Sequence, residues 1–451
     1  MDKNNCLCEK NMKSKRLTSV FAALTVLFSV VSFSFVACTR NNDFIPVLRF
    51  AIASDVHVAD SGSDEEEARL EKLFEISYSH SKSDKSKYKT LDVVAFAGDF
   101  TNLGTLVSMQ KFKSIVDDHI KPETKPIISL GNHEFYTDPG STETRYQSVF
   151  KGEVDEHLVI GGFHFIKLSP NGEYFGEEKL RWLREELKKA ALDTPDLPIF
   201  VIQHQHVKGT VYGSVGWGVD GLYEILSNYP QVVDFSGHSH FPIQDERSLW
   251  QGDFTAIGTG TLSYVEMGLN GLSSDYVFPD GKEGDYKLRG RTGESDYAVF
   301  QIVECDQTGN IRITGYDLLS ESRLFERYIA TPTDKSSFIL NESKMVTTPV
   351  PEFSAGSRCS IRKAENGDVL LTVPQASSDG YIESYRAEVY CDDELLGTYY
   401  ALSGQIFLPP SPSIHIRLTG LEGGGRYRVK VYAVNAYGSV SKRPLELQFI
   451  L

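Results

Sequence analysis

The chain has 451 residues, of which 41% are apolar and 24% are charged. This composition is ordinary for a soluble globular protein, and the length suffices for two or more domains. The formal net charge at pH 7 is −15, and residues 1–38 hold five basic and two acidic side chains, so the rest of the chain is more negative still. Such acidity disfavours nucleic acid and anionic membrane surfaces as bulk partners, and no nucleic-acid partner is expected.

The first 46 residues are typical of a targeting segment. Lys13-Ser14-Lys15-Arg16 is basic, residues 17–37 are almost wholly apolar or hydroxyl-bearing, and a small residue precedes Cys38. This order predicts a secretory signal over 1–38 and a tether over 39–46. Its end resembles the lipobox of bacterial lipoproteins, with Phe35 where leucine is usual. The resemblance implies lipidation of Cys38 and a membrane-anchored lipoprotein of the cell envelope, facing the periplasm or the cell surface. The alternative is an uncleaved anchor, because a run of this length could span ~30 Å of hydrocarbon.

Five short motifs follow, each directly after an apolar run (residues 51–54, 91–97, 127–130, 199–203 and 232–236). They are Asp55-x-His57, Gly98-Asp99, Gly131-Asn132-His133-Glu134, His204, and Gly237-His238-Ser239-His240. Short apolar runs that end at glycine or turn residues indicate buried strands. Open α/β sheets place their sites in loops at strand ends, so the five motifs together predict one site.

The residue types in these motifs suit a pair of metal ions. Two divalent ions held ~3.5–4 Å apart can grip a phosphoryl group. Such a pair needs a bridging carboxylate, for which Asp99 is the natural residue, and imidazoles that bind the ions more tightly than carboxylates alone. The neutral amide of Asn132 keeps the summed ligand charge low, so that a bridging water can ionise near neutral pH. Nitrogen and oxygen ligands without a thiolate fit Mn, Fe, Co or Zn.

Over about residues 47–330 the pattern resembles the calcineurin-like metallophosphoesterases, in the form found in bacterial class III cyclic-nucleotide phosphodiesterase-like members. The resemblance implies an α/β fold, a four-layer α/β/β/α sandwich with two sheets inside, and two divalent or trivalent metal ions. His133 would lie beside the nucleophile without binding metal. The ligands would be Asp55, His57, Asp99 and His240 for the first ion, and Asp99, Asn132, His204 and His238 for the second.

The predicted function is therefore a dinuclear-metal hydrolase of phosphate esters, with phosphodiesters preferred. A metal-bridging hydroxide would attack the phosphorus, Asp99 would hold both ions, and His133 would assist the leaving group. Phe135 and Tyr136 stand near where protein phosphatases of this superfamily place an arginine, so a small phosphate ester is expected rather than a phosphoprotein. The alternatives are a phosphomonoesterase with the same site and a non-catalytic cell-surface binding protein on the same fold.

Two residues near the motifs are candidates for substrate contact. His206 stands where the family often has a proline, so His204 is expected as the ligand and His206 as a substrate-side or merely exposed residue. Asn102 lies three residues after Asp99, where purple acid phosphatases carry a metal-binding tyrosine, and its presence disfavours that subgroup. Asn102 either contacts substrate or caps a helix that begins near Thr105.

Further elements complete this domain. Acidic residues 64–67 predict the start of a helix that runs to Tyr78, and leucines at helical spacing predict a second helix over 177–190. Strands are expected at 159–169, within 252–264 and at 297–305. Between the last two, residues 268–293 are rich in Gly, Ser and Asp, and they form either a substrate lid or an insertion without function.

A second domain is expected after a hydrophilic linker over 331–349. Residues 350–451 show short strand signals with turns between them, at 368–374, 385–391, 395–401, 415–418, 427–433 and 445–451. The last segment resembles the end of a fibronectin type III domain, which implies a small all-β sandwich with Tyr427 as its tyrosine-corner residue. We interpret it as a spacer or packing module. Cys359 and Cys391 either form a disulfide or, like Cys305, fill the core. The oligomeric state is not predicted.

Overall fold

The structure is a computed structural model that describes residues 44–266, 297–330, 332–339, 348–363 and 367–451. The chain separates into residues 1–36 and 37–451, and every described residue belongs to the second part. The predicted signal segment with Cys38 and the predicted lid over 268–293 lie outside the described residues. Within the described ranges, no helix combines the length and apolar character that crossing a membrane would require.

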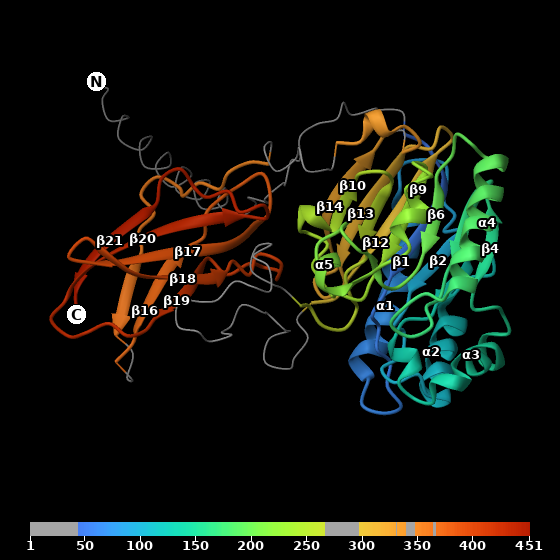
Figure 1. Ribbon diagram of the computed structural model, residues 1–451, viewed down its shortest axis with the longest axis horizontal. Coiled ribbons are helices and arrows are strands. Elements are labelled where there is room, and N and C mark those ends of the chain that lie inside the picture. The colour runs from blue at the N-terminus through green and yellow to red at the C-terminus, as the bar shows by residue number, and fades with distance from the viewer. Residues whose placement is uncertain (1–43, 267–296, 331, 340–347, 364–366) are drawn as a thin grey trace, which may run out of the picture. The chain divides into compact units, whose positions relative to one another are not determined.

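Two six-stranded sheets form the first domain (Figure 1). The first has the order β14-β13-β12-β1-β2-β3, with β1, β2 and β3 parallel and the pairs from β1 to β14 antiparallel. Its strands are β1 Pro46–Ala53, β2 Val93–Ala97, β3 Lys125–Ser129, β12 Val299–Asp306, β13 Ile311–Asp317 and β14 Ser322–Ile329.

The second sheet has the order β10-β11-β9-β6-β5-β4, in which β11, β9, β6 and β5 are parallel and the two edge strands are antiparallel. Its strands are β4 Glu156–Ile160, β5 Phe163–Lys167, β6 Ile199–Ile202, β9 Val232–Ser236, β10 Leu249–Gln251 and β11 Thr255–Gly258. A small separate pair is formed by β7 His206–Val207 and β8 Gly218–Val219.

An aromatic core joins the two sheets. The ring of Phe50 on β1 contacts Phe165, Phe200 and Phe235 of the second sheet edge-to-face, at centroid distances of 5.3, 5.0 and 5.7 Å. Edge-to-face pairs add to the free energy gained from burying the rings themselves. Successive residues of a strand point to opposite faces, so the next residue, Ala51, belongs to the core on the helical side of the sheet.

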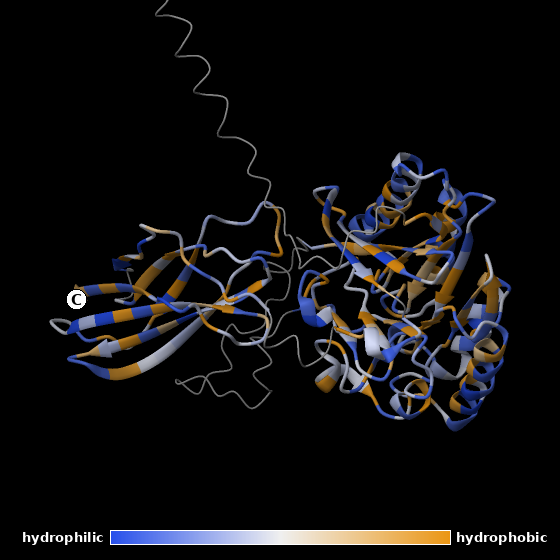
Figure 2. Cartoon of the chain, turned by 90° about the horizontal axis from the view of Figure 1, so that it is seen from above, coloured by the Kyte–Doolittle hydropathy of each residue, from blue (hydrophilic) through white to orange (hydrophobic). Residues whose placement is uncertain are grey.

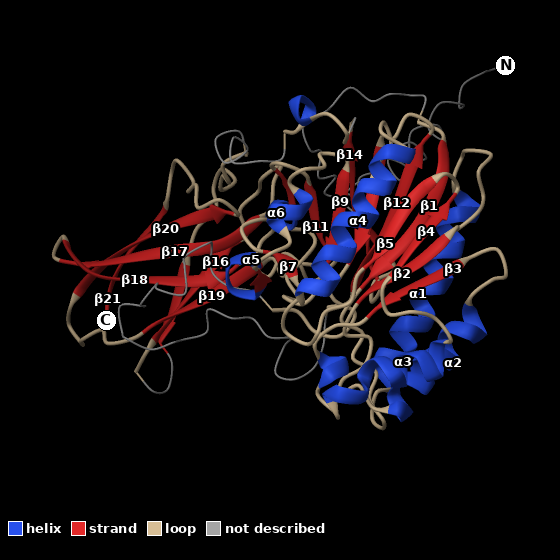
Figure 3. Cartoon of the chain, turned by 45° about the vertical axis from the view of Figure 1, so that its right-hand side comes forward, coloured by secondary structure: helices blue, strands red, loops and turns tan. Residues whose placement is uncertain are grey.

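Helices cover the outer faces, which gives the four predicted layers (Figure 3). The first sheet is covered by α1 Asp64–Ser83, α2 Leu106–His119 and α3 Thr142–Phe150. The second is covered by α4 Glu177–Asp193 and α6 Tyr223–Leu226, and the short α5 Ser214–Trp217 lies against β7 and β8. The 3-10 helices are η1 His133–Phe135, η2 Pro139–Ser141, η3 Glu246–Ser248 and η5 Lys335–Ser337.

Two predicted strands differ from the structure. Residues 159–169 do not form one strand: β4 and β5 form a hairpin that turns at Gly161 and Gly162, whose φ angles are +60° and +85°. Two consecutive glycines at positive φ are the signature of a tight hairpin turn. Within 252–264 the strand is limited to β11, Thr255–Gly258, which pairs with β9. The helix predicted to end at Tyr78 continues to Ser83.

The C-terminal region is rich in strands, and all six predicted strands are present. Along one strand of this region, β16, buried and half-buried residues alternate, and such banding is visible among the strands near the C-terminus in Figure 2. One sheet has the order β15-β16-β19 and the other β18-β17-β20-β21, and they enclose a common core. The strands are β15 Ser360–Lys363, β16 Val369–Pro374, β17 Ile382–Cys391, β18 Glu394–Leu402, β19 Ser413–Leu418, β20 Arg426–Asn435 and β21 Leu445–Ile450.

Two sequence expectations concern single residues of this region. The hydroxyl of Tyr427 donates to the carbonyl of Glu422 and accepts from its N–H, at 3.0 and 2.7 Å, which is the geometry of a tyrosine corner. Cys305, Cys359 and Cys391 are all free, so the disulfide alternative is not realised and the first two are buried as core residues.

Candidate metal centre

All five motif loops begin at the carboxyl ends of parallel strands. They meet at one edge of the sandwich, where loops of the two sheets bond to each other: His238 N–H donates to the carboxylate of Asp55 at 3.1 Å, and His204 Nδ1 donates to the carbonyl of Ala97 at 2.8 Å. The strands that precede the loops are β1, β2 and β3 of the first sheet and β6 and β9 of the second. Both sheets therefore contribute loops to the same edge of the domain.

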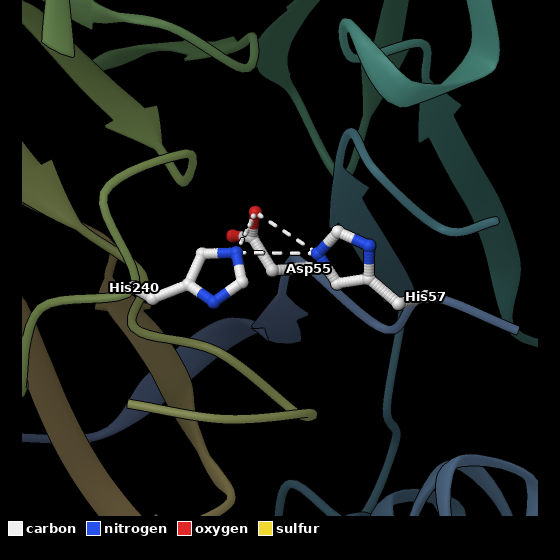
Figure 4. A group of neighbouring side chains, drawn as sticks. All are labelled: Asp55, His57 and His240. Carbon is white, nitrogen blue, oxygen red and sulfur yellow. Dashed lines mark hydrogen bonds and ion pairs between the residues drawn. The ribbon is translucent and has the colours of Figure 1, made fainter. Parts of the chain in front are cut away.

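Asp55, His57 and His240 form the first ligand cluster (Figure 4). The Nε2 atom of His240 lies 3.1 Å from Oδ1 of Asp55 and 3.2 Å from Nε2 of His57. All three side chains are buried. Two imidazole nitrogens and a carboxylate oxygen therefore face the same point.

Asp99, His204 and His238 form the second cluster. The Nε2 atom of His204 lies 3.0 Å from Oδ2 of Asp99 and 3.0 Å from Oδ1 of Asn132. Asn132 Nδ2 donates to the hydroxyl of Tyr136 at 2.9 Å, which turns its amide oxygen towards the cluster. The amide oxygen of Asn132 therefore lies beside the second cluster.

Asp99 also belongs to a third group, with His57 and His133. The carboxylate of Asp99 is therefore near members of both clusters, as a bridging ligand must be. The Nε2 atom of His133 lies 3.9 Å from Oδ2 of Asp99, and its side chain, like that of His238, is partly exposed.

The hydrogen bonds of the second ring nitrogens fit a metal site. His204 Nδ1 donates to the carbonyl of Ala97 at 2.8 Å, and His240 Nδ1 donates to that of Tyr264 at 2.9 Å. Such bonds fix the tautomer and leave Nε2 to coordinate an ion. The buried oxygens and nitrogens of the two clusters thus suit two ions of the Mn, Fe, Co or Zn type, without selecting among these metals.

Five of the predicted ligands have a left-handed backbone. Non-glycine residues rarely adopt positive φ, and each instance costs on the order of 1–3 kcal/mol. This strain is stored where the side chains must converge. The φ angles are +53° for Asp55, +57° for His57, +50° for Asp99, +72° for His238 and +56° for His240.

Two motif glycines are required by close approach. A Cβ atom at Gly131 would lie 2.2 Å from Oδ1 of Asp99, and one at Gly237 would lie 2.4 Å from Oδ2 of Asp55. In each case the missing side chain leaves room for a ligand that belongs to a different motif.

Glu134 organises the loops from within, a role that the sequence analysis did not assign. Its buried carboxylate accepts hydrogen bonds from the N–H groups of Asp99, Thr101 and Gly131, at 3.1, 2.8 and 2.7 Å. Burial and the charge of Asp99 raise the pKa of Glu134 to about 7. The available signal was its place in Gly-Asn-His-Glu, but its partners are fixed only by the fold.

Burial and neighbouring charges set the protonation of the ligands. Burial lowers and the charge of Asp99 raises the pKa of His204, with a net value of about 10. The opposed effects of burial and Asp55 likewise leave the pKa of His240 raised. Burial and the charge of His240 lower the pKa of His57 to about 3. Two imidazoles therefore hold protons that a metal ion must displace.

The two candidate substrate residues lie differently from expectation. His206 is buried, and its ring nitrogens lie 2.8 and 2.7 Å from the hydroxyls of Ser236 and Ser239, which gives no support to a substrate contact. Asn102 does not cap α2, because Thr105 is the N-cap and accepts from Ser108 N–H. Instead, the backbone carbonyl of Asn102 accepts from His133 Nδ1 at 2.8 Å.

The two ligand clusters together offer nitrogen and oxygen donors for two metal ions. Residues 48–242 match the family model described as Calcineurin-like phosphoesterase, so this part of the chain is a calcineurin-like metallophosphoesterase domain. No curated protein matches the chain.

Three similar solved structures have TM-scores below 0.5. A purple acid phosphatase from yellow lupin seeds is 13% identical with a TM-score of 0.44, covering 62% of this chain and 53% of its own. This chain thus spans about half the length of that enzyme. A structure of PhoD is 11% identical with a TM-score of 0.37, covering 64% and 72%. The twitchin kinase region from C. elegans is 21% identical with a TM-score of 0.16, covering 23% and 17%.

Proposed function

We propose that this centre hydrolyses phosphodiesters. The observation that carries the proposal is the pair of ligand clusters around Asp99, with a partly exposed histidine beside them. Two bound ions would act as Lewis acids on the phosphate and would lower the pKa of water. His133 Nδ1 donates to the carbonyl of Asn102, so Nε2 is the atom that can hold a proton for the leaving oxygen.

The position of Arg145 favours a diester over a monoester. A monoester dianion carries one more negative charge than a diester and gains more from a guanidinium. Arg145 follows the Gly-Asn-His-Glu motif in the chain, but it donates to the backbone carbonyls of Gly104, Glu134 and Asp138. Its guanidinium is thereby engaged in the loop rather than offered to a phosphate.

The test is hydrolysis by the Mn²⁺-loaded chain of bis-p-nitrophenyl phosphate against p-nitrophenyl phosphate. We expect preference for the diester, and loss of activity in Asp99→Asn together with loss of bound metal. His133→Ala should keep its metal and lose about 100-fold or more in kcat, the usual share of a general acid. Preference for the monoester would replace the proposal with a phosphatase of the same site.

We further propose that the chain is a lipoprotein anchored through Cys38 and exposed in the cell envelope. Support comes from the basic segment, the apolar run and the small residue before Cys38.

We also propose that residues 350–451 are a fibronectin type III-like module that acts as a spacer or packing domain. Support comes from the three-plus-four arrangement of strands and from the Tyr427 hydroxyl contacts.

A further inference from the structure

Three partly exposed aromatic side chains stand next to the metal centre. Their exposed fractions are 52% for Tyr136, 38% for Trp217 and 37% for Tyr264. Large rings left partly in water at a concave or functional site commonly bind a ligand, because covering them is favourable. We call these three residues the aromatic rim.

Each ring of the aromatic rim contacts a histidine of the centre. The ring centroids of Tyr136 and His133 are 4.3 Å apart, those of Tyr264 and His240 are also 4.3 Å apart, and those of Trp217 and His238 are 5.4 Å apart. The rim therefore touches both ligand clusters and the candidate general acid.

The rings come from three separate segments that the fold holds in place. Tyr136 is the C-cap of η1, and its hydroxyl accepts from Asn132 Nδ2. Trp217 is the last residue of α5, and its N–H donates to the carbonyl of Gly213 at 2.9 Å. The Tyr264 carbonyl accepts from His240. Tyr and Trp have only two side-chain torsions, so holding them costs little conformational entropy.

A phosphodiester bound at the clusters would have two organic arms, and the rim rings lie against histidines that would surround its phosphate. An arm with a planar ring can stack on them or meet them edge-to-face, whereas a short alkyl arm gains little. We propose that the aromatic rim selects phosphodiesters in which an arm carries a planar aromatic or heteroaromatic ring. This inference rests on the phosphodiesterase activity proposed above.

The kinetic test uses two diesters with the same leaving group. Bis-p-nitrophenyl phosphate and methyl p-nitrophenyl phosphate both release p-nitrophenolate, and they differ only in the arm that is retained. We compare the ratio of their kcat/KM values between the Mn²⁺-loaded wild-type chain and the Trp217→Ala/Tyr264→Ala variant. The ratio should fall about 10-fold or more, mainly through KM for the aryl diester, as expected from the loss of ring stacking.

Two controls accompany this comparison. Tyr328→Ala removes another partly exposed tyrosine, which lies on β14 and whose hydroxyl bonds to Glu326, so its ratio should equal that of the wild type. Bound metal per chain verifies that the centre is intact in each variant. If the double variant does not fold, Trp217→Leu and Tyr264→Leu replace it, since leucine keeps apolar volume without a ring.

A binding measurement separates the rim from the reaction. Calorimetry of the metal-loaded chain should show phenylphosphonate binding about 10-fold more tightly than methylphosphonate, with the difference lost in the double variant. Equal ratios or equal affinities in wild type and variant would overturn the rim while leaving the phosphodiesterase intact. Failure of the wild type to cleave either diester, with phenylphosphonate still preferred, would overturn the activity and keep the rim.

Discussion

Position 131 requires glycine because the Asp99 side chain occupies the space that a Cβ atom would need. A Cβ there would lie 2.2 Å from Oδ1 of Asp99. Gly131→Ala should therefore displace that carboxylate and weaken metal binding by about 10–100-fold, the range seen when groups that orient ligands are disturbed.

The matched control is Gly140→Ala in a nearby turn, where an added Cβ meets nothing within 4 Å. Metal titration of both variants by calorimetry makes the comparison. Similar affinities in the two variants would contradict the contact argument.

Protons compete with metal at His204. The pKa of this residue is raised to about 10, with burial lowering it and Asp99 raising it more strongly. A metal ion must displace that proton, so Mn²⁺ affinity should rise as pH increases towards 10, by about 10-fold per pH unit for each proton released. Titrations at pH 6, 7 and 8, in buffers of differing ionisation enthalpy, measure both the affinity and the protons released. An Mn²⁺ affinity that does not change between pH 6 and 8 would show that His204 and His240 hold no protons for the metal to displace.

The ligand candidates could be singled out from the sequence because metal chemistry concentrates such residues in short motifs after apolar runs. The role of Glu134 could not be predicted from its motif, since its partners at Asp99 and Thr101 lie more than thirty residues away in the sequence. Trp217 and Tyr264 carried no signal, because a single aromatic residue in a loop looks the same whether it lies beside a metal or on a bare surface.

In α4, leucines at helical spacing pack against the second sheet. Leu183 is fully buried against the second sheet, whereas Leu192 in the same helix is 75% exposed. Leu183→Ala should destabilise the domain by about 2–5 kcal/mol. The urea midpoint should fall for Leu183→Ala and stay close to wild type for Leu192→Ala, and equal shifts would refute the assigned face.

Tyr427 fixes the start of β20 to the preceding turn through both of its hydroxyl contacts with Glu422. Tyr427→Phe should cost about 1–3 kcal/mol, because the backbone partners lose their bonds. Tyr390→Phe is the control, since among the described residues its hydroxyl bonds to a side chain, that of Glu388, and not to the backbone. Thermal unfolding of both variants measures the difference, and a smaller loss for Tyr427 than for Tyr390 would count against the corner.

Strand prediction failed where two strands join without a polar loop. Between Val159 and Ser169 the two glycines, Gly161 and Gly162, are the sole turn signal, and both flanking runs are strand-like. Only the positive φ of both glycines converts the run into a hairpin. The six C-terminal strands were easier to predict because polar turns separate them.

At the scale of the whole molecule, attachment through Cys38 is the expectation that decides where the enzyme works. Mass spectrometry of the wild type should find acyl groups on an N-terminal peptide that begins at Cys38, and Cys38→Ser should abolish both the acylation and the cleavage before residue 38. Unmodified Cys38 in a membrane-bound protein would favour the uncleaved anchor instead.

The missing side chains at Gly131 and Gly237 link positions far apart along the chain, since each makes room for an aspartate of another motif. A library that varies one motif at a time would therefore find mostly inactive variants. Libraries that vary Gly131 with Asp99, or Gly237 with Asp55, are the ones in which epistasis between loops should become measurable. Positions in different loops of the centre must therefore change together. Redesign of its specificity is better begun at the aromatic rim than within these loops.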